Sequence, residues 1–256
     1  MKKPLIVDKP LDKIFLGSII VLDTLSYQIM KKEAVREKKY KFAVIATDVV
    51  LFTVKDEKLQ VLLIKMKKKL YKEHWALPGG LIKSQESLET AAKRNLLAKS
   101  GVKNIYLEQL RTFGDISRDP FGRVVSVAYF ALIPYSGIKL KTTKKYAGIN
   151  WFPIKKLPDL AYDHKKMIAL AVKRLKAKLG YTNIVYSLLP QEFSLSDLQE
   201  TYEIILNRKL DKRNFRKKIL LSKLLIRTNK KEGGMPHRPA VIYRFKQRSP
   251  QIIDLL

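Results

Sequence analysis

The run FAVIATDVVLFTV, residues 42 to 54, is the stretch that most limits the folds open to this chain. Its apolar and β-branched residues predict a strand buried in a core. The turn KDEK follows it, and LQVLLIKM predicts a returning strand, so that the two form an antiparallel hairpin. With 256 residues, of which 46% are apolar, the chain can bury that hairpin in one large domain or two ordinary ones.

Further strands and helices follow the hairpin. Residues 88 to 97 have helical spacing, and Gly101 is expected to end that helix in the left-handed conformation. The segments NIYLEQLRTFG, RVVSVAYFALIPY and INWFP predict strands, and the second of them alternates, with Val125 and Tyr129 on one side. An amphipathic helix is expected to end at Gly180, where this first unit stops.

A second unit begins near Tyr181. SLSDLQETYEIIL predicts a helix capped by Ser194 or Ser196, and a short turn separates it from the basic stretch DKRNFRKKILLS. That stretch predicts a second helix, capped by Asp211, and two short strands around a Gly/Pro-rich tip come after it. This order of elements is typical of a winged helix-turn-helix. In the second helix, the side chains expected to be buried are Phe215, Ile219 and Leu220.

Composition excludes several kinds of site. The chain has no cysteine, which rules out disulfides, zinc-cysteine sites and thiol nucleophiles. Its histidines, His74, His164 and His237, do not have metal-ligand spacing. The most apolar run, residues 14 to 22, is too short to cross a membrane, so no membrane partner and a cytoplasmic location are expected.

The net charge of +29, from 52 basic and 23 acidic residues, has two explanations of equal weight. A polyanionic partner would offset the self-repulsion of such a chain. A lysine-biased proteome would place Lys at many solvated positions without any partner.

The stretch PGGLIKSQESLETAAKRNLLAKSGV, residues 78 to 102, resembles the Nudix box in outline. That signature contains three further glutamates, and these map to Asn95, Ala98 and Lys99 in this sequence. The degenerate box comprises Gly80, Glu86, Arg94, Asn95, Ala98, Lys99 and Gly101.

The loss of those glutamates bears directly on metal binding. Positions i, i+3 and i+4 lie on one face of a helix, where the family gathers carboxylates around magnesium or manganese ions. Mg²⁺ needs hard oxygen ligands, and the ammonium of Lys99 repels it. We therefore expect no metal cofactor, no catalytic residues and no enzymatic activity.

The resemblance extends well beyond the box. YLEQLRTFGDISRDPFGRVVSVAYFALIPY, LLPQEFSLSDLQETYEIILNRKLDKRNFRKKIL and GGMPHRPAVIYRF are similar to the Nudix-related transcriptional regulators, over about residues 40 to 247. The resemblance implies an α/β (α+β) fold, with a Nudix-type mixed sheet between helices followed by a winged helix-turn-helix. The predicted divisions are an extension of unknown role at 1–38, a Nudix-like domain at 39–180, a DNA-binding domain at 181–247 and a tail at 248–256.

The resemblance also implies a function. Family members are dimeric regulators that sense ADP-ribose or a related nucleotide in NAD metabolism, or a pentose-derived ligand, and many bind their effector without cleaving it. We expect a homodimer on a palindromic operator in double-stranded DNA, with a nucleotide or sugar-phosphate effector held in the Nudix domain. The residues expected to bind that effector are Arg94, Lys99, Phe113, Arg118 and Arg123.

Each of these effector residues has a structural alternative. The alternative for Arg118 is to hold its loop by pairing with Asp115 or Asp119, and the alternative for Arg94 is to pair with Glu86, as is common in this fold. Aromatic stacking on an adenine competes in each case with burial in the core, and the residues concerned are Phe113, Phe121 and Tyr129.

The basic helix is the predicted DNA reader. Residues at the start of a recognition helix meet base edges, and those here are Lys212, Arg213, Asn214 and Arg216. Phosphate and wing contacts are expected from Lys217, Lys230, Lys231, His237 and Arg238. Two other functions compete with this one: an active Nudix hydrolase of ADP-ribose or a related nucleoside diphosphate, and a nucleic-acid-binding protein that acts through charge alone.

Overall fold

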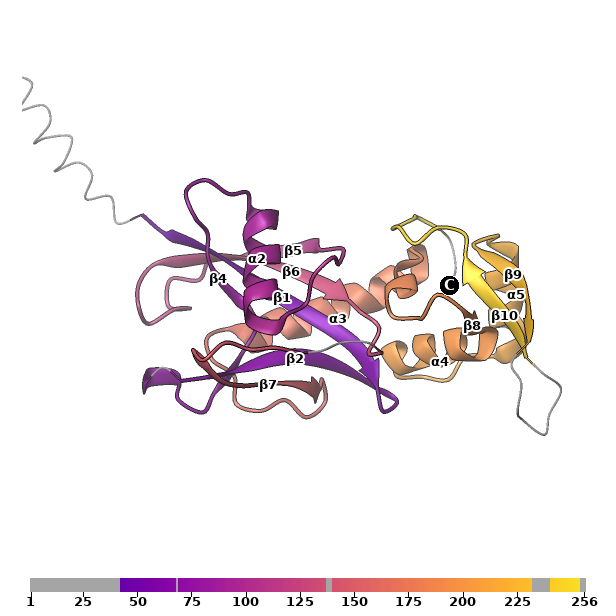
Figure 1. The fold of residues 1–256 in the computed structure, drawn as a ribbon, viewed down its shortest axis with the longest axis horizontal. Helices are drawn as coiled ribbons and strands as arrows, with labels where there is room; N and C mark the ends of the chain where they lie inside the picture. The colour runs from indigo at the N-terminus through magenta and orange to yellow at the C-terminus, as the bar shows by residue number, and fades with distance from the viewer. Residues whose placement is uncertain (1–41, 68, 137–139, 232–239, 254–256) are drawn as a thin grey trace, which may run out of the picture. The chain divides into compact units, whose positions relative to one another are not determined.

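The computed structural model describes residues 42–67, 69–136, 140–231 and 240–253. The predicted extension at 1–38 lies outside these ranges. The elements, most of which are labelled in Figure 1, follow the chain in the order β1 (Val44–Lys55), β2 (Lys58–Met66), η1 (Lys69–Tyr71), β3 (Trp75–Ala76), β4 (Gly79–Leu81), α2 (Leu88–Ser100), β5 (Glu108–Phe113), β6 (Val124–Leu132), β7 (Tyr146–Pro153), α3 (His164–Tyr181), η2 (Ile184–Ser187), β8 (Phe193–Ser194), α4 (Leu195–Leu206), α5 (Lys212–Leu221), β9 (Leu225–Lys231) and β10 (Val241–Phe245).

The first seven strands form one mixed sheet. Strands β1 and β2 make the predicted antiparallel hairpin, and the turn between them places Asp56 and Glu57 in the left-handed region. Strand β1 also runs parallel to β6 and antiparallel to β4, while β7 pairs with β2. The buried strand predicted from residue 42 therefore lies at the centre of the sheet, with partners on both edges.

Two helices cover opposite faces of this sheet. Successive side chains of β1 alternate, so that Leu51 packs in the cluster that contains Leu96 of α2, while Phe52 packs in the cluster that contains Leu175 of α3. Strand β6 alternates, as predicted; the structure places Tyr129 on the α2 side, and the other face of the strand is buried too. The prediction of a mixed sheet between helices is confirmed.

The ends of the two helices follow from local hydrogen bonding. Ser87 caps α2 by accepting from the backbone of Thr90, and Gly101 ends it at φ 77°, as predicted. The expectation that α3 would end at Gly180 is wrong, because this helix continues to Tyr181 and Thr182 is extended. Thr182 forms a bridge with Ile252, so tertiary pairing decides where this helix stops.

The second unit has the predicted winged helix-turn-helix order. Helices α4 and α5 are followed by β9 and β10, which form a three-stranded sheet with β8. Of the two alternatives, Ser194 caps α4, in a capping box with Asp197. Asp211 caps α5 by accepting from the backbone of Asn214.

The turn between α4 and α5 is held by one carboxylate. Glu203 accepts hydrogen bonds from the Leu210 backbone and the Gln199 side chain, and forms an ion pair with Lys209 at 2.8 Å. The hydrogen bond from Lys209 is the main reason why the pKa of Glu203 falls to about 2. The turn between the two helices is therefore held by a carboxylate that stays ionised near neutral pH.

One prediction for α5 is wrong. Phe215 and Ile219 are buried, but Leu220 is 48% exposed. Residues 215 and 219 lie one helical turn apart on the face toward α4, and position 220 is rotated away from that face. The apolar character of Leu220 did not predict which way its side chain points, because that depends on its position around the helix.

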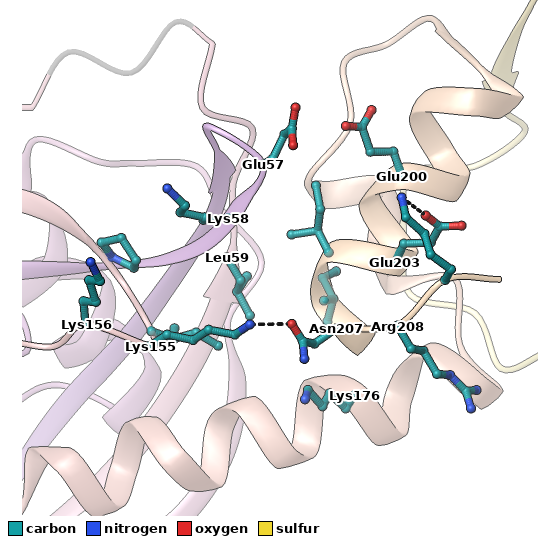
Figure 2. Close-up of a pocket in the computed structure, with 15 residues that line it drawn as sticks. Glu57, Lys58, Leu59, Lys155, Lys156, Lys176, Glu200, Glu203, Asn207 and Arg208 are labelled. Atoms are coloured by element: carbon teal, nitrogen blue, oxygen red, sulfur yellow. Dashed lines mark hydrogen bonds and ion pairs between the residues drawn. The ribbon is translucent and has the colours of Figure 1, made fainter.

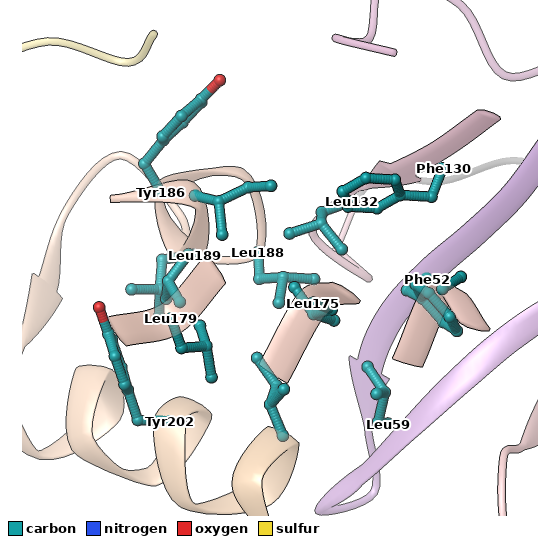
Figure 3. Close-up of a cluster of buried hydrophobic side chains, with 14 of the residues drawn as sticks. Phe52, Leu59, Phe130, Leu132, Leu175, Leu179, Tyr186, Leu188, Leu189 and Tyr202 are labelled. Carbon is teal, nitrogen blue, oxygen red and sulfur yellow. The ribbon is translucent and has the colours of Figure 1, made fainter. Parts of the chain in front are cut away.

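A continuous hydrophobic cluster joins the α3 face of the sheet to the winged helix-turn-helix (Figure 3). It includes Phe52 and Leu132 from the sheet, Leu175 from α3, and Leu188 and Tyr202 beyond it. The predicted boundary at residue 180 therefore falls within a shared core rather than in an open linker.

The segment predicted as a tail also packs on this region. Arg248 donates hydrogen bonds to the backbone oxygens of Pro190 and Leu189, at 3.0 and 2.7 Å. Asn183 and Gln251 are joined by side-chain and backbone hydrogen bonds, and Ile253 packs against the core. Residues 248–253 are thus part of the folded unit.

Candidate effector pocket and nucleic-acid interface

A cavity of about 410 Å³ lies where the box helix meets strands β1 and β4. Glycine residues of β4 form one wall, and the loop before β6 forms another. The polar side chains that line it are Asp48, Lys67, Lys99, Arg118, Asp119, Lys145, Tyr146, Tyr162 and His164. The cavity is large enough for part of a nucleotide and carries charges of both signs.

Two residues of the degenerate box, Glu86 and Arg94, form an ion pair with each other. Arg94 donates through Nε to Glu86 Oε2 at 2.8 Å, and through Nη2 to Oε1 at 2.5 Å. This bidentate contact lowers the pKa of Glu86 to about 2. Glu86 also accepts from the Lys83 backbone. The pair holds the loop before α2, and neither residue lines the cavity, as the structural alternative for Arg94 predicted.

Asn95 occupies the first of the three altered positions. Its amide nitrogen donates to the carbonyl oxygen of Gly80 at 3.1 Å and to Thr47 Oγ1 at 3.3 Å. It is 5% exposed, so the amide ties the helix to β1 and β4 rather than facing a ligand. Ala98, at the second position, is exposed and has no polar side-chain atom.

Lys99, at the third position, lines the cavity. Its ammonium donates to the carbonyl oxygen of Gly79 and lies 5.2 Å from the centre of the Tyr146 ring. A backbone oxygen and an aromatic face are both favourable partners for a cation. An amide, a methyl group and an ammonium do not make a donor set for a divalent ion, and the described residues hold no cluster of three or more acidic or histidine side chains around one point.

Arg118 has a partner that neither alternative named. Its guanidinium donates to Asp163 Oδ1 at 2.8 Å and Oδ2 at 3.2 Å, and it lies 3.8 Å from Asp48. The side chain is 3% exposed. With Asp115 it shares only a backbone hydrogen bond. The planar fork of Arg118 is therefore engaged in an ion pair within the pocket wall.

Asp48 and His164 belong to the same buried network, and neither was among the predicted site residues. Asp48 accepts from Ser126 at 2.6 Å and lies 3.6 Å from Nε2 of His164. His164 accepts from the Leu77 backbone through Nδ1, which requires a neutral ring. Burial lowers the pKa of His164, in agreement with that neutral state. Asp48 is the single charged residue in the apolar stretch 42–54, and that was the signal in the sequence that could have located it.

The other predicted effector residues lie apart from the cavity. Arg123 is exposed and donates to the carbonyl oxygens of Gly114 and Asp115. Phe113 packs partly buried against the core, and Tyr129 is buried in it. Phe121 is the one of these aromatic residues that lines the cavity. The structure thus brings together Lys99, Arg118 and Phe121 in one site, but not Arg94, Arg123 or Phe113.

The start of α5 presents an exposed basic surface. Lys212, Arg213 and Asn214 are exposed there, and so is Lys217 one turn further on. Arg216 faces inward instead: it is partly buried, and its Nη2 donates to Ser196 of α4 at 3.2 Å. The exposed set is suited to contact with a duplex, and Arg216 is suited to holding α5 against α4.

The predicted wing is described only in part. Lys230 is exposed on β9 and pairs with Glu192 at 2.8 Å. Lys231 ends the same strand, and His237 and Arg238 lie outside the described residues.

A second cavity, of about 800 Å³, lies between the β1–β2 turn and the C-terminal half of α4. Figure 2 shows Lys155 reaching the left-handed residue Asn207, to which it donates at 2.5 Å. Lys155 thereby links the loop after β7 to the end of α4.

No helix in the described part of the chain is long and apolar enough to cross a membrane.

Comparison with known protein families matches both parts of the chain. Residues 44–171 match the NUDIX domain, and residues 185–245 match the NrtR DNA-binding winged helix domain. A Nudix fold joined to a winged helix-turn-helix defines the class of Nudix-related transcriptional regulators.

Individual proteins narrow this class to a family. The ADPR responsive transcriptional repressor NtrR of Acinetobacter baylyi is 36% identical over 215 residues, which are 82% of this chain and 85% of the relative. The crystal structure of Shewanella oneidensis NrtR complexed with a 27mer DNA has a TM-score of 0.70 and 35% identity, and the match covers 79% of this chain and 93% of that one. The chain belongs to the NrtR family.

An enzyme is also related, over a shorter range. The ADP-ribose pyrophosphatase of Methanocaldococcus jannaschii is 31% identical over 140 residues, which are 55% of this chain and 79% of the enzyme.

Proposed function

We propose that this protein is a transcriptional repressor that binds a palindromic operator as a homodimer and releases or retains it in response to ADP-ribose or a closely similar nucleotide. The observation that carries the proposal is the 36% identity, over 82% of the chain, with a repressor described as ADPR responsive. The pocket and the exposed basic start of α5 supply the two surfaces that such a protein needs. The effector shifts DNA binding only if it prefers one dimer geometry over the other.

We infer further that the Nudix domain binds its ligand without cleaving it. Of the box carboxylates, Glu86 is engaged by Arg94 and by a backbone amide, so it is not open to a metal ion. Positions 95, 98 and 99 offer no anionic oxygen. The relationship to an ADP-ribose pyrophosphatase makes turnover of ADP-ribose the competing function.

One experiment separates these functions. The full chain is incubated with ADP-ribose and MgCl₂ while AMP release is followed, and its binding to a palindromic duplex is measured by fluorescence anisotropy with and without ADP-ribose. We expect no AMP above the background rate, together with a change in operator affinity when ADP-ribose is added. Sustained AMP release would support the hydrolase instead. Equal affinity for the operator and for random duplexes, with the same steep salt dependence, would indicate binding through charge alone.

Arg213 tests the role of α5. Replacement of Arg213 by alanine is expected to weaken operator binding by roughly 1–3 kcal/mol, because an exposed arginine at the start of a recognition helix reaches base edges. The matched control is Arg213→Lys, which keeps the charge but loses the bidentate fork. The Arg213→Lys variant should bind the operator more weakly than the native chain does, whereas its affinity for a random duplex should be nearly unchanged. An equal loss on both duplexes in Arg213→Ala would assign Arg213 to phosphate contacts only.

A further inference from the structure

In the effector pocket, the ammonium of Lys99 lies beside an oxygen that would suit a metal ion. Its Nζ donates to the carbonyl oxygen of Gly79, at the point where α2 faces β4. Backbone carbonyl oxygens are among the hard ligands that divalent cations use. Lys99 is also held by the face of the Tyr146 ring. The place beside the Gly79 carbonyl oxygen is thus occupied by a cation of the chain itself, the ammonium of Lys99.

We propose that Lys99 is a covalently tethered replacement for the divalent ion, and that it binds the diphosphate of the effector directly, so that recognition is independent of metal. The inference rests on the proposed effector-sensing function and specifies how the pocket recognises its ligand. An ammonium has three N–H donors, and the bond to Gly79 uses one of them. Two donors remain for phosphate oxygens.

The surrounding charges favour this role for Lys99. Lys67 and Lys145 line the same cavity, and Lys67 is anchored to the carbonyl oxygen of Lys144 at 2.8 Å. Arg118, the remaining lining cation, is paired with Asp163 in the wall. Two carboxylates also line the cavity: Asp48 lies 3.8 Å from Arg118, and Asp119 accepts from the Phe121 backbone. The three lysines outnumber these carboxylates and supply positive charge to a ligand that carries one negative charge on each phosphate.

A divalent ion would compete with this arrangement. It would have to approach the Gly79 carbonyl oxygen within contact distance of an ammonium, and like charges repel whatever the local dielectric constant. In addition, Asn95 donates its amide hydrogens to Gly80 and Thr47, so its oxygen is the only ligand atom it can offer, and that oxygen accepts from Arg94. Mg²⁺ is therefore not expected to strengthen binding.

The test is calorimetric titration of the full chain with ADP-ribose, once in excess EDTA and once in MgCl₂. We expect the native affinity to agree within about twofold in the two buffers, because the ammonium of Lys99 and not a metal ion contacts the diphosphate. Lys99→Gln should weaken binding roughly 10- to 100-fold in both buffers, since it removes a charge-assisted hydrogen bond. Lys99→Arg keeps the positive charge and should recover most of that loss.

Matched controls isolate the diphosphate contact. Lys103→Gln removes an exposed lysine three residues beyond the end of α2 and outside the cavity, and it should bind ADP-ribose like the native chain. Adenosine, which lacks the diphosphate, should bind native protein and Lys99→Gln equally. Thermal unfolding of each variant verifies that the fold is intact.

The outcomes are distinguishable. Native binding that requires Mg²⁺, or native-like affinity in Lys99→Gln, overturns the role of Lys99 and leaves the proposed effector function standing. Absence of ADP-ribose binding by the native chain in both buffers overturns the proposed function, and the role of Lys99 with it.

Discussion

Replacement of Arg118 by alanine is expected to lower the free energy of unfolding by about 3–5 kcal/mol, because it leaves buried carboxylates without their counter-ion. Asp163 would lose two hydrogen bonds to the guanidinium, and Asp48 would lose a cation 3.8 Å away. All three side chains are less than 10% exposed, so the carboxylates depend on the arginine rather than on solvent to offset their charge. Urea denaturation of the full chain measures the loss.

Arg123→Ala is the matched control for this variant. It removes an arginine from the same loop region, but one that is exposed and donates only to the carbonyl oxygens of Gly114 and Asp115. Its expected cost is below about 1 kcal/mol. If Arg118→Ala were no more destabilising than this control, the network around Asp48 would not be holding the pocket wall together.

Replacement of Gly79 by alanine is expected to cost about 3 kcal/mol, because there is no room for a β-carbon between β4 and β1. An added Cβ would lie 2.5 Å from the carbonyl oxygen of Thr47, and closer still to the Asp48 carboxylate. Thr47 and Asp48 both belong to the paired strand β1, so the clash is removed only if β4 separates from β1. That movement would also carry the Gly79 carbonyl oxygen away from Lys99.

Gly148→Ala is the control for the strand substitution. A Cβ at that position of β7 would lie 3.9 Å from Lys65 Cβ, which is an ordinary contact. Because alanine restricts the unfolded chain more than glycine does, the control should be neutral or slightly stabilising. Thermal unfolding and ADP-ribose titration of both variants provide the comparison, and a native-like Gly79→Ala would show that β4 adapts easily.

Much of the fold could be predicted because the relevant interactions are local. Caps at Ser194, Asp211 and Gly101 involve atoms only a few residues apart, and the structure has all three as expected. The hairpin of β1 and β2 follows from two apolar runs around a short turn. By contrast, the predicted end of α3 was wrong. The bridge from Thr182 to Ile252 joins segments 70 residues apart, and no local pattern indicates it.

The candidate site could be predicted only in part. The position of Lys99 on the pocket face follows from its place in the box motif. The role of Arg123 does not, since exposed loop arginines have many backbone acceptors within reach. The inward direction of Arg216 depends on Ser196 of the neighbouring helix, which lies 20 positions earlier in the chain.

The sequence by itself determined which chemical groups stand at positions 95, 98 and 99, and therefore that no carboxylate can gather a metal ion there. Helical spacing alone places those groups on one face. Only the tertiary structure decided that Arg118 pairs with Asp163, 45 residues away, and that Asp48 bonds to Ser126 at a separation of 78. Long-range pairs of this kind depend on how the strands are ordered in the sheet, and that order is set by burial of the whole core rather than by neighbours along the chain.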